Sequence, residues 1–201
     1  MNFKRKVIFN LLFLLFFLTV KAQSLNTSVF LNEIKTNFKN AKDITIDLTY
    51  SQNKKSNSVR FFIKKNKYLV IVNNEYKILF NGVKTYKINL EDKEVTVSSN
   101  QKDGDLSPNK ILDLINNSEN KIIKSDKNFE QVKVNVDKKS EAVLTINKKN
   151  RKIEVIKFYQ KKIETSAAYL TKYLLNQNLP SNLFDFNKNT YKDFYITDLD
   201  K

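Results

Sequence analysis

The chain has 201 residues, with 36 lysine or arginine residues against 21 acidic ones, and no cysteine or histidine. The missing cysteine excludes disulfides and thiol nucleophiles, and the missing histidine excludes an imidazole base and histidine-containing zinc sites. Among the carboxylates no pair has the spacing expected of a general acid and base, and Ser166 lacks the flanking glycines of a nucleophile elbow. We therefore expect a protein that is not an enzyme and that binds neither a metal ion nor another cofactor.

The first 22 residues have the pattern of a cleaved export signal. Three basic residues at 4–6 precede an apolar run of 14 residues from Val7 to Val20, and Ala22 completes a sequence suited to a signal peptidase. The run is too short for an ordinary spanning helix, which needs about 20 residues. We predict a signal peptide over 1–22, cleavage before Gln23 and one soluble domain over 23–201 that lies outside the cytoplasm. An uncleaved anchor is the alternative.

Removal of the signal would also remove four basic residues, which lowers the net charge from +15 to +11. An exported basic protein is not expected to meet nucleic acid, so lipid headgroups or an acidic partner are the available targets. Many lysines, such as Lys64, Lys65, Lys148 and Lys149, fall at predicted turns, where they protect strand edges from association. A composition that is rich in lysine throughout is the simpler interpretation of the charge.

The hydrophobic pattern predicts one helix followed by an antiparallel sheet. A helix is expected from about Thr27 to Lys39, because Phe30, Ile34 and Phe38 recur every four residues. From 44 onwards apolar and polar residues alternate, which is typical of strands with one buried face. Residues 68–72 are apolar on both faces, so that strand should be central or covered on its second side.

Two local signals refine this pattern. Asn81-Gly82 predicts a tight type I′ hairpin, since these residues accept positive φ angles most readily. Ser107-Pro108 predicts the start of a second, short helix with an apolar side. Strands then continue to about Asn176, for a total of ten or eleven.

A sheet of this size must curl, because twisted open sheets seldom exceed about ten strands. The expected fold class is therefore mainly β with a few helices. It is a curved, incompletely closed antiparallel β-barrel of about 10–11 strands, with helices that cover a cavity for an apolar ligand.

Three segments in order resemble the LolA-like family of periplasmic outer-membrane lipoprotein carriers. Residues 81–95, NGVKTYKINLEDKEV, are similar to that family's DGKTLWxYDPDxxQV hairpin, and 106–112, LSPNKIL, to its sPxxLL helix. Residues 183–199 resemble its FxFxP ending. Tyr86 stands where the family has tryptophan. Arg60 is out of register with the family's lid-latching arginine, so no latch can be assigned.

The resemblance implies a monomeric carrier that takes acylated lipoproteins from an inner-membrane ABC exporter to an outer-membrane acceptor. Acyl chains need shelter from water, because each buried CH₂ is worth about 0.8 kcal/mol. The inward faces of the predicted strands are candidates for the lining of a lipid-binding cavity: Ile44, Ile46, Leu48, Tyr50, Phe61, Ile63, Tyr68, Phe80, Tyr86 and Ile88. Ile111, Leu114 and Ile115 would form its lid. Ordinary core packing is the alternative for each residue.

A second function is compatible with the same residues. A periplasmic binding or sensor protein of this fold could bind other lipids or detect mislocalised lipoproteins, because proteins of one fold can have different functions. Depletion of this protein from the cell distinguishes the two hypotheses. Loss of a carrier strands lipoproteins in the inner membrane, whereas loss of a sensor changes only a stress response.

Overall fold

The computed structural model describes residues 27–99, 120–135 and 139–200, and these form one α-helix and one large sheet. The predicted signal peptide over 1–22 and the predicted second helix, with Ile111, Leu114 and Ile115, lie outside the described residues. In chain order the elements are α2 (Thr27–Asn40), β1 (Ile44–Gln52), β2 (Lys55–Lys64), β3 (Lys67–Val72), β4 (Tyr76–Phe80), β5 (Thr85–Asn89), β6 (Glu94–Ser98), β7 (Asn120–Ser125), β8 (Phe129–Asn135), β9 (Ser140–Asn147), β10 (Lys152–Gln160), β11 (Ile163–Leu175), the 3₁₀ turn η1 (Ser181–Phe184) and β12 (Tyr195–Asp198).

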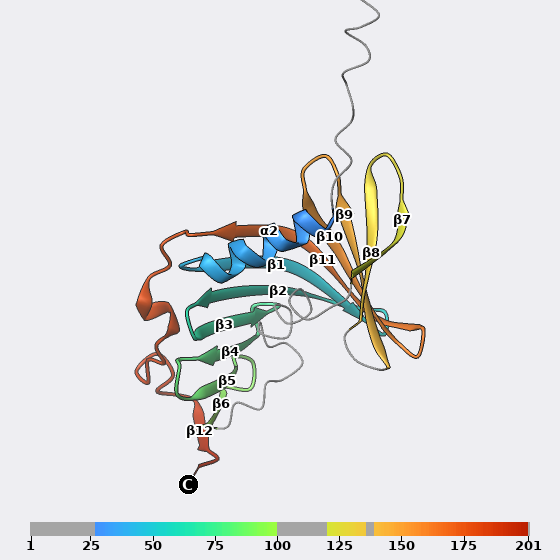
Figure 1. Cartoon of the computed structure of the whole chain (residues 1–201). Coiled ribbons are helices and arrows are strands. Elements are labelled where there is room, and N and C mark those ends of the chain that lie inside the picture. The colour runs from blue at the N-terminus through green and yellow to red at the C-terminus, as the bar shows by residue number, and fades with distance from the viewer. Residues whose placement is uncertain (1–26, 100–119, 136–138, 201) are drawn as a thin grey trace, which may run out of the picture.

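All twelve strands of the described residues belong to a single open sheet, in the order β12-β6-β5-β4-β3-β2-β1-β11-β10-β9-β8-β7. Neighbouring strands are antiparallel, except that β12 lies parallel to β6. The pairing of β1 with β11 joins the two halves of the sheet, as Figure 1 shows. The predicted mainly β fold with a large curved antiparallel sheet is confirmed, and the sheet of the described residues is not closed into the expected barrel. The described strands number twelve, with β12 as the one that the hydrophobic pattern does not predict.

Bulges explain why the sheet curls. β11 carries an extra residue, Thr171, opposite the step from Asp47 to Leu48 in β1. β10 has a second irregularity between Ile153 and Val155. A bulge increases the local twist and bends its strand, so these positions turn the β7–β11 half away from the β1–β6 half. The sheet thereby acquires a concave face, which α2 partly covers in Figure 1.

Helix α2 forms where the four-residue repeat predicts it. It begins at Thr27 and ends at Asn40, one residue beyond the predicted end. Phe30 and Leu31 are almost fully buried and pack in the same core as Ile46 of β1 and Val70 of β3. The alternating side chains of the central strands and the apolar side of α2 therefore build one continuous core on the concave face.

The convex face has its own cover, which is supplied by the C-terminal segment. Leu69 of β3 and Leu79 of β4 pack against Phe184 of η1, which is completely buried. Next to them the rings of Tyr86 and Phe186 stack with centroids 4.3 Å apart. Residues 68–72 are expected to form a strand that is either central or covered on its second side, and β3 is both.

The loop between β4 and β5 differs from the predicted type I′ turn. Phe80 pairs with Thr85, so the loop has four residues, and of the Asn81-Gly82 pair only Gly82 has a positive φ, at 97°. The Asn81 Oδ1 atom accepts hydrogen bonds from the N–H groups of Val83 and Lys84, at 3.0 and 2.9 Å. The side chain of Asn81 closes a wider loop, which makes the type I′ prediction wrong.

Asp43, directly before β1, holds the segment that follows β11 by three hydrogen bonds. Its carboxylate is 2% exposed and accepts hydrogen bonds from the backbone N–H groups of Gln177, at 2.7 Å, and Leu179, at 3.1 Å. Its carbonyl oxygen accepts a third, 2.9 Å bond from the Asn176 N–H group. These bonds hold the chain directly after β11 and direct the C-terminal segment towards the convex face.

We predict that Asp43→Ala lowers the free energy of unfolding by about 1–3 kcal/mol, because two partly buried N–H groups lose their charged acceptor. Urea unfolding followed by circular dichroism measures this change. Asp126→Ala is the matched control, since Asp126 accepts two similar backbone bonds in an exposed turn. An effect of Asp43→Ala no larger than that of the control would contradict an anchoring role.

Candidate functional site

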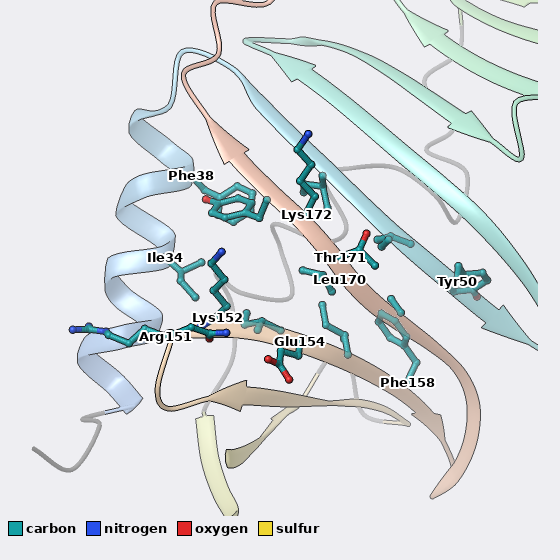
Figure 2. Close-up of a pocket in the computed structure, with 17 residues that line it drawn as sticks. Ile34, Phe38, Tyr50, Arg151, Lys152, Glu154, Phe158, Leu170, Thr171 and Lys172 are labelled. Atoms are coloured by element: carbon teal, nitrogen blue, oxygen red, sulfur yellow. The ribbon is translucent and has the colours of Figure 1, made fainter. Parts of the chain in front are cut away.

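An apolar groove of about 330 Å³ lies between α2 and the concave face of β1, β10 and β11 (Figure 2). This volume falls at the lower end of the range of about 300–1,000 Å³ that is usual for small-molecule sites. The groove is partly open to solvent. Its apolar lining consists of Ile34, Phe38, Ile46, Leu48, Tyr50, Ile153, Ile156, Phe158, Ala168, Leu170 and Tyr173.

The bulges decide which side chains of β10 and β11 enter the groove. In β1 the lining residues follow a strict period of two, as in a regular strand. In β11 the apolar lining steps from Ala168 to Leu170 and then by three residues to Tyr173, across the extra residue Thr171. In β10 the same step of three separates Ile153 from Ile156. Each bulge therefore returns large apolar side chains to the concave face.

Helix α2 closes one end of the groove with Ile34 and Phe38. The Phe38 ring packs against the Tyr173 ring, with centroids 5.1 Å apart. From the turn before β10, the Arg151 guanidinium pairs with Glu33 at 2.6 Å and lies 5.8 Å from the centroid of the Phe30 ring. Both charged side chains are about half exposed, so this ion pair adds little stability and mainly restricts where the helix rests.

Arg60, the arginine nearest in sequence to the latch position of the resembling family, pairs with Asp47 of β1. Its guanidinium donates to both carboxylate oxygens of Asp47, at 2.7 and 3.0 Å. The same pair raises the pKa of Arg60, through the hydrogen bonds first and the charge of Asp47 second.

Half of the six polar residues at the groove are basic, namely Arg151, Lys152 and Lys172. The others are Asn150, Glu154 and Thr171. Lys172 pairs with Asp47 in the β1–β11 ladder, so its side chain lies on the face opposite to Ile46 and Leu48. The Glu154 Oε1 atom accepts a 2.8 Å hydrogen bond from the side-chain amide of Asn147. The groove thus combines a long apolar wall with a small group of charges.

The hydroxyl of Tyr173 is a polar group of the site whose hydrogen-bonding capacity is not used. Its hydroxyl is buried and has no hydrogen-bond partner among the described residues. Burial raises the pKa of Tyr173 to about 12, because the phenolate would lose hydration without gaining a partner. The hydroxyl therefore stays protonated at physiological pH and remains an unused donor.

Of the predicted lining residues, Ile46, Leu48 and Tyr50 lie in the wall of the groove. Five others lie in the adjoining core on the concave side: Ile44, Phe61, Ile63, Tyr68 and Phe80. Tyr86 and Ile88 pack on the convex side under the C-terminal segment, away from the groove. The sequence patterns did not single out the lining from β10 and β11, because the bulges interrupt the alternation there.

Two features are absent from the part of the chain that the structure describes. None of its clusters of acidic side chains reaches the three ligands that a metal site would need. No helix in it is both long and apolar enough to cross a membrane.

No family model and no curated protein sequence matches the chain. Among solved structures, an uncharacterized conserved protein from Thermus thermophilus has a TM-score of 0.58 at 8% identity, over 86% of this chain and 98% of that one. A LolA superfamily protein from Nitrosomonas europaea scores 0.41 at 11% identity, over 81% and 99% of the two chains. A putative outer membrane lipoprotein-sorting protein domain from Vibrio parahaemolyticus scores 0.41 at 12% identity, over 83% and 100%.

These similarities concern the fold alone, and scores of 0.41 carry no argument about function. The curved open sheet with a helix across its concave face agrees with the mainly β fold class that the sequence predicts. What the protein binds must be argued from the groove itself.

We predict that Tyr173→Phe leaves stability near neutral pH unchanged or raises it by up to about 1 kcal/mol, since it removes a buried donor without a partner. The raised pKa adds a pH dependence. The folded state keeps its phenol proton between about pH 10 and 12, where the unfolded chain loses it, so wild-type stability falls across that window. Tyr173→Phe has no phenol proton, so this contribution to the loss of stability at high pH is absent from the variant.

Urea unfolding near neutral pH and at about pH 11 tests this prediction, with the exposed Tyr195→Phe as the control. A clear loss of stability in Tyr173→Phe near neutral pH would show that the hydroxyl has a stabilising partner.

Proposed function

We propose that this protein binds acyl chains in the groove under α2 and carries them through the periplasm. In the full proposal the cargo is an acylated lipoprotein, the donor is an inner-membrane ABC exporter, the recipient is an outer-membrane acceptor, and the carrier is a monomer. The apolar groove is the observation that carries the proposal. The three resembling sequence segments support the lipoprotein cargo.

The size and lining of the groove suit a single acyl chain. Eleven apolar side chains from α2, β1, β10 and β11 surround about 330 Å³, which is small for several chains. Each methylene that leaves water for this wall stabilises the complex by about 0.8 kcal/mol, so an acyl chain of ordinary length would bind firmly. The open side and the single covering helix leave a route for release.

Catalysis is the less suitable role for these residues. The groove offers one carboxylate, Glu154, whose hydrogen bond comes from the neutral side chain of Asn147. General acid and base catalysis needs a proton donor and an acceptor placed around a reacting bond. Binding and release need neither.

A second candidate function is a binding or sensor protein of the same fold for other lipids. The basic side chains Arg151 and Lys152 at the groove favour it, because a lipid with an acidic headgroup would match them. Both candidates share the central element of the proposal, an acyl chain in the groove.

The direct test is the lipid content of the protein purified from the periplasm of cells that export it. Native mass spectrometry should find about one acyl-bearing molecule per protein, and solvent extraction should release it. Absence of any lipid or lipoprotein, even after acyl-chain cross-linking in the cell, would overturn the proposal.

We predict that Leu48→Glu and Leu170→Glu reduce the bound acyl chain at least tenfold, because each places a charge in the apolar wall. Leu48 is almost fully buried, whereas Leu170 is only partly buried and tolerates a polar side chain more readily. Tyr169→Glu is the matched control, since Tyr169 is exposed and adjacent in β11 but does not line the groove.

Circular dichroism and urea unfolding accompany the loading measurement. Folded variants with normal loading would contradict binding in this groove. Unfolding of both groove variants, with loading intact in Leu170→Ala, would assign these residues to ordinary core packing.

A further inference from the structure

We propose that one end of the sheet docks on a lipid surface that carries anionic headgroups. This basic end consists of residues 124–128, around the β7–β8 turn, and residues 148–152, around the β9–β10 turn. The inference goes beyond the proposed function, because it concerns the surface on which the protein rests and does not depend on the ligand in the groove.

Hydrogen bonds hold the two turns together. The backbone N–H group of Lys148 donates to the carbonyl oxygen of Asn128, at 2.8 Å. The Lys148 ammonium group donates to Ser125 Oγ and to the carbonyl oxygen of Asp126, both at 2.7 Å. Figure 1 shows the two turns at the same end of strands β7 to β10. They therefore present one continuous surface.

The basic end has a larger excess of positive charge than the chain as a whole. Six of its residues are basic and one, Asp126, is acidic, whereas the whole chain has 36 basic and 21 acidic residues. The basic residues are Lys124, Lys127, Lys148, Lys149, Arg151 and Lys152. Lys148 pairs with Glu130 and Arg151 with Glu33, but no ion pair among the described residues includes the other four. Those four lysines are exposed and available to a partner.

The carboxylate of Asp126 offsets only part of this charge. Its Oδ1 atom accepts hydrogen bonds from the backbone N–H groups of Phe129 and Asn128, both at 2.8 Å. These two bonds hold the pKa of Asp126 below its usual range, and the charges of Lys124 and Lys148 contribute less. Asp126 therefore stabilises its own turn and leaves the surface strongly positive.

Strand β7 adds exposed apolar side chains next to the lysines. Ile122 and Ile123 are 51% and 48% exposed, although β7 is an edge strand of the described sheet. Charged side chains normally protect such an edge from association, and Lys121 and Lys124 suit that role. The two isoleucines between them do not, because exposed apolar residues on an edge favour association. Apolar side chains beside basic ones are typical of surfaces that lie in the lipid interface.

The basic end also borders the groove. Arg151 and Lys152 line it, and Figure 2 shows both near Ile34 of α2. Membrane contact at this end would place the groove close to the headgroups, so an acyl chain would have a short path through water. A lipid surface offers many anionic groups, which suits lysines spread over two turns. An acidic protein would need carboxylates in a matching arrangement.

The first test measures binding to vesicles by flotation, with protein purified from the periplasm of cells that export it. We expect binding to phosphatidylcholine vesicles that contain about 30% phosphatidylglycerol, and at least about tenfold weaker binding to phosphatidylcholine alone. The difference should shrink at about 1 M salt, where the Debye length is about 3 Å.

The double variant Lys127→Glu with Lys149→Glu should bind the anionic vesicles at least about tenfold more weakly. Both residues lie outside the groove lining, so acyl-chain loading should be unchanged. Lys161→Glu with Lys162→Glu is the matched control. These lysines are exposed in the β10–β11 turn at the opposite end of β10, and the change in net charge is the same. The control should weaken binding by less than about threefold, because distant charges are screened.

A second test uses the absence of tryptophan from the chain, which makes an introduced indole a specific reporter. The fluorescence of Ile123→Trp should shift to shorter wavelength on anionic vesicles, because the indole enters the headgroup region. Val83→Trp is the control, since Val83 is 72% exposed in the β4–β5 loop of the other half of the sheet. Its emission should not shift.

Several outcomes would overturn docking through the basic end. They are equal losses of binding in the two lysine pairs, equal shifts from the two tryptophans, and equal binding to vesicles with and without phosphatidylglycerol. Tight binding to polyglutamate without binding to vesicles would overturn it in favour of an acidic protein partner. None of these results bears on acyl-chain loading, which is measured separately and decides the proposed function.

Discussion

One helix cannot fill the concave face of a twelve-stranded curved sheet, and the rest of the site follows from that constraint. α2 buries Phe30 and Leu31 deeply, which secures the helix to the core. Beyond Ile34 and Phe38 the wall of β1, β10 and β11 continues without a covering element among the described residues. The apolar surface left there forms a groove, and a ligand with a long apolar part can complete the packing.

Strand β1 serves both the scaffold and the groove. Its pairing with β11 joins the halves of the sheet, and Asp43 at its start holds the C-terminal segment that covers the convex face. Ile46, Leu48 and Tyr50 of the same strand form the groove wall. A firm scaffold on the convex side thus allows the concave side to remain incompletely packed. The stability of the fold and the capacity to bind are therefore separable by mutation.

The sequence predicts local features of this molecule better than it predicts long-range ones. Regular alternation identifies β1 and its inward residues, and the four-residue repeat identifies α2. Alternation does not say which face of the sheet is concave, so Tyr86 and Ile88 pack on the opposite face from Leu48. The parallel pairing of β12 with β6 joins segments about a hundred residues apart, which no local pattern reveals.

The turns and bulges are a second part of the structure that the sequence does not predict. At Asn81-Gly82 a side-chain hydrogen bond overrides the preference of the dipeptide, whereas Asn53-Lys54 and Lys161-Lys162 adopt paired positive φ angles without glycine. In β10 and β11 one inserted residue changes the step from two to three, so Ile153 and Tyr173 join a lining that strict alternation would not assign them. Such insertions depend on pairing between strands.

The most direct measurement of the central claim is the position at which a bound acyl chain touches the protein. A fatty acid with a photoreactive diazirine near its methyl end would be bound, cross-linked and located by peptide mass spectrometry. The account predicts labelling concentrated on the residues of α2, β1, β10 and β11 that line the groove. Labelling concentrated on the convex face, around Leu183 and Phe186, would contradict it.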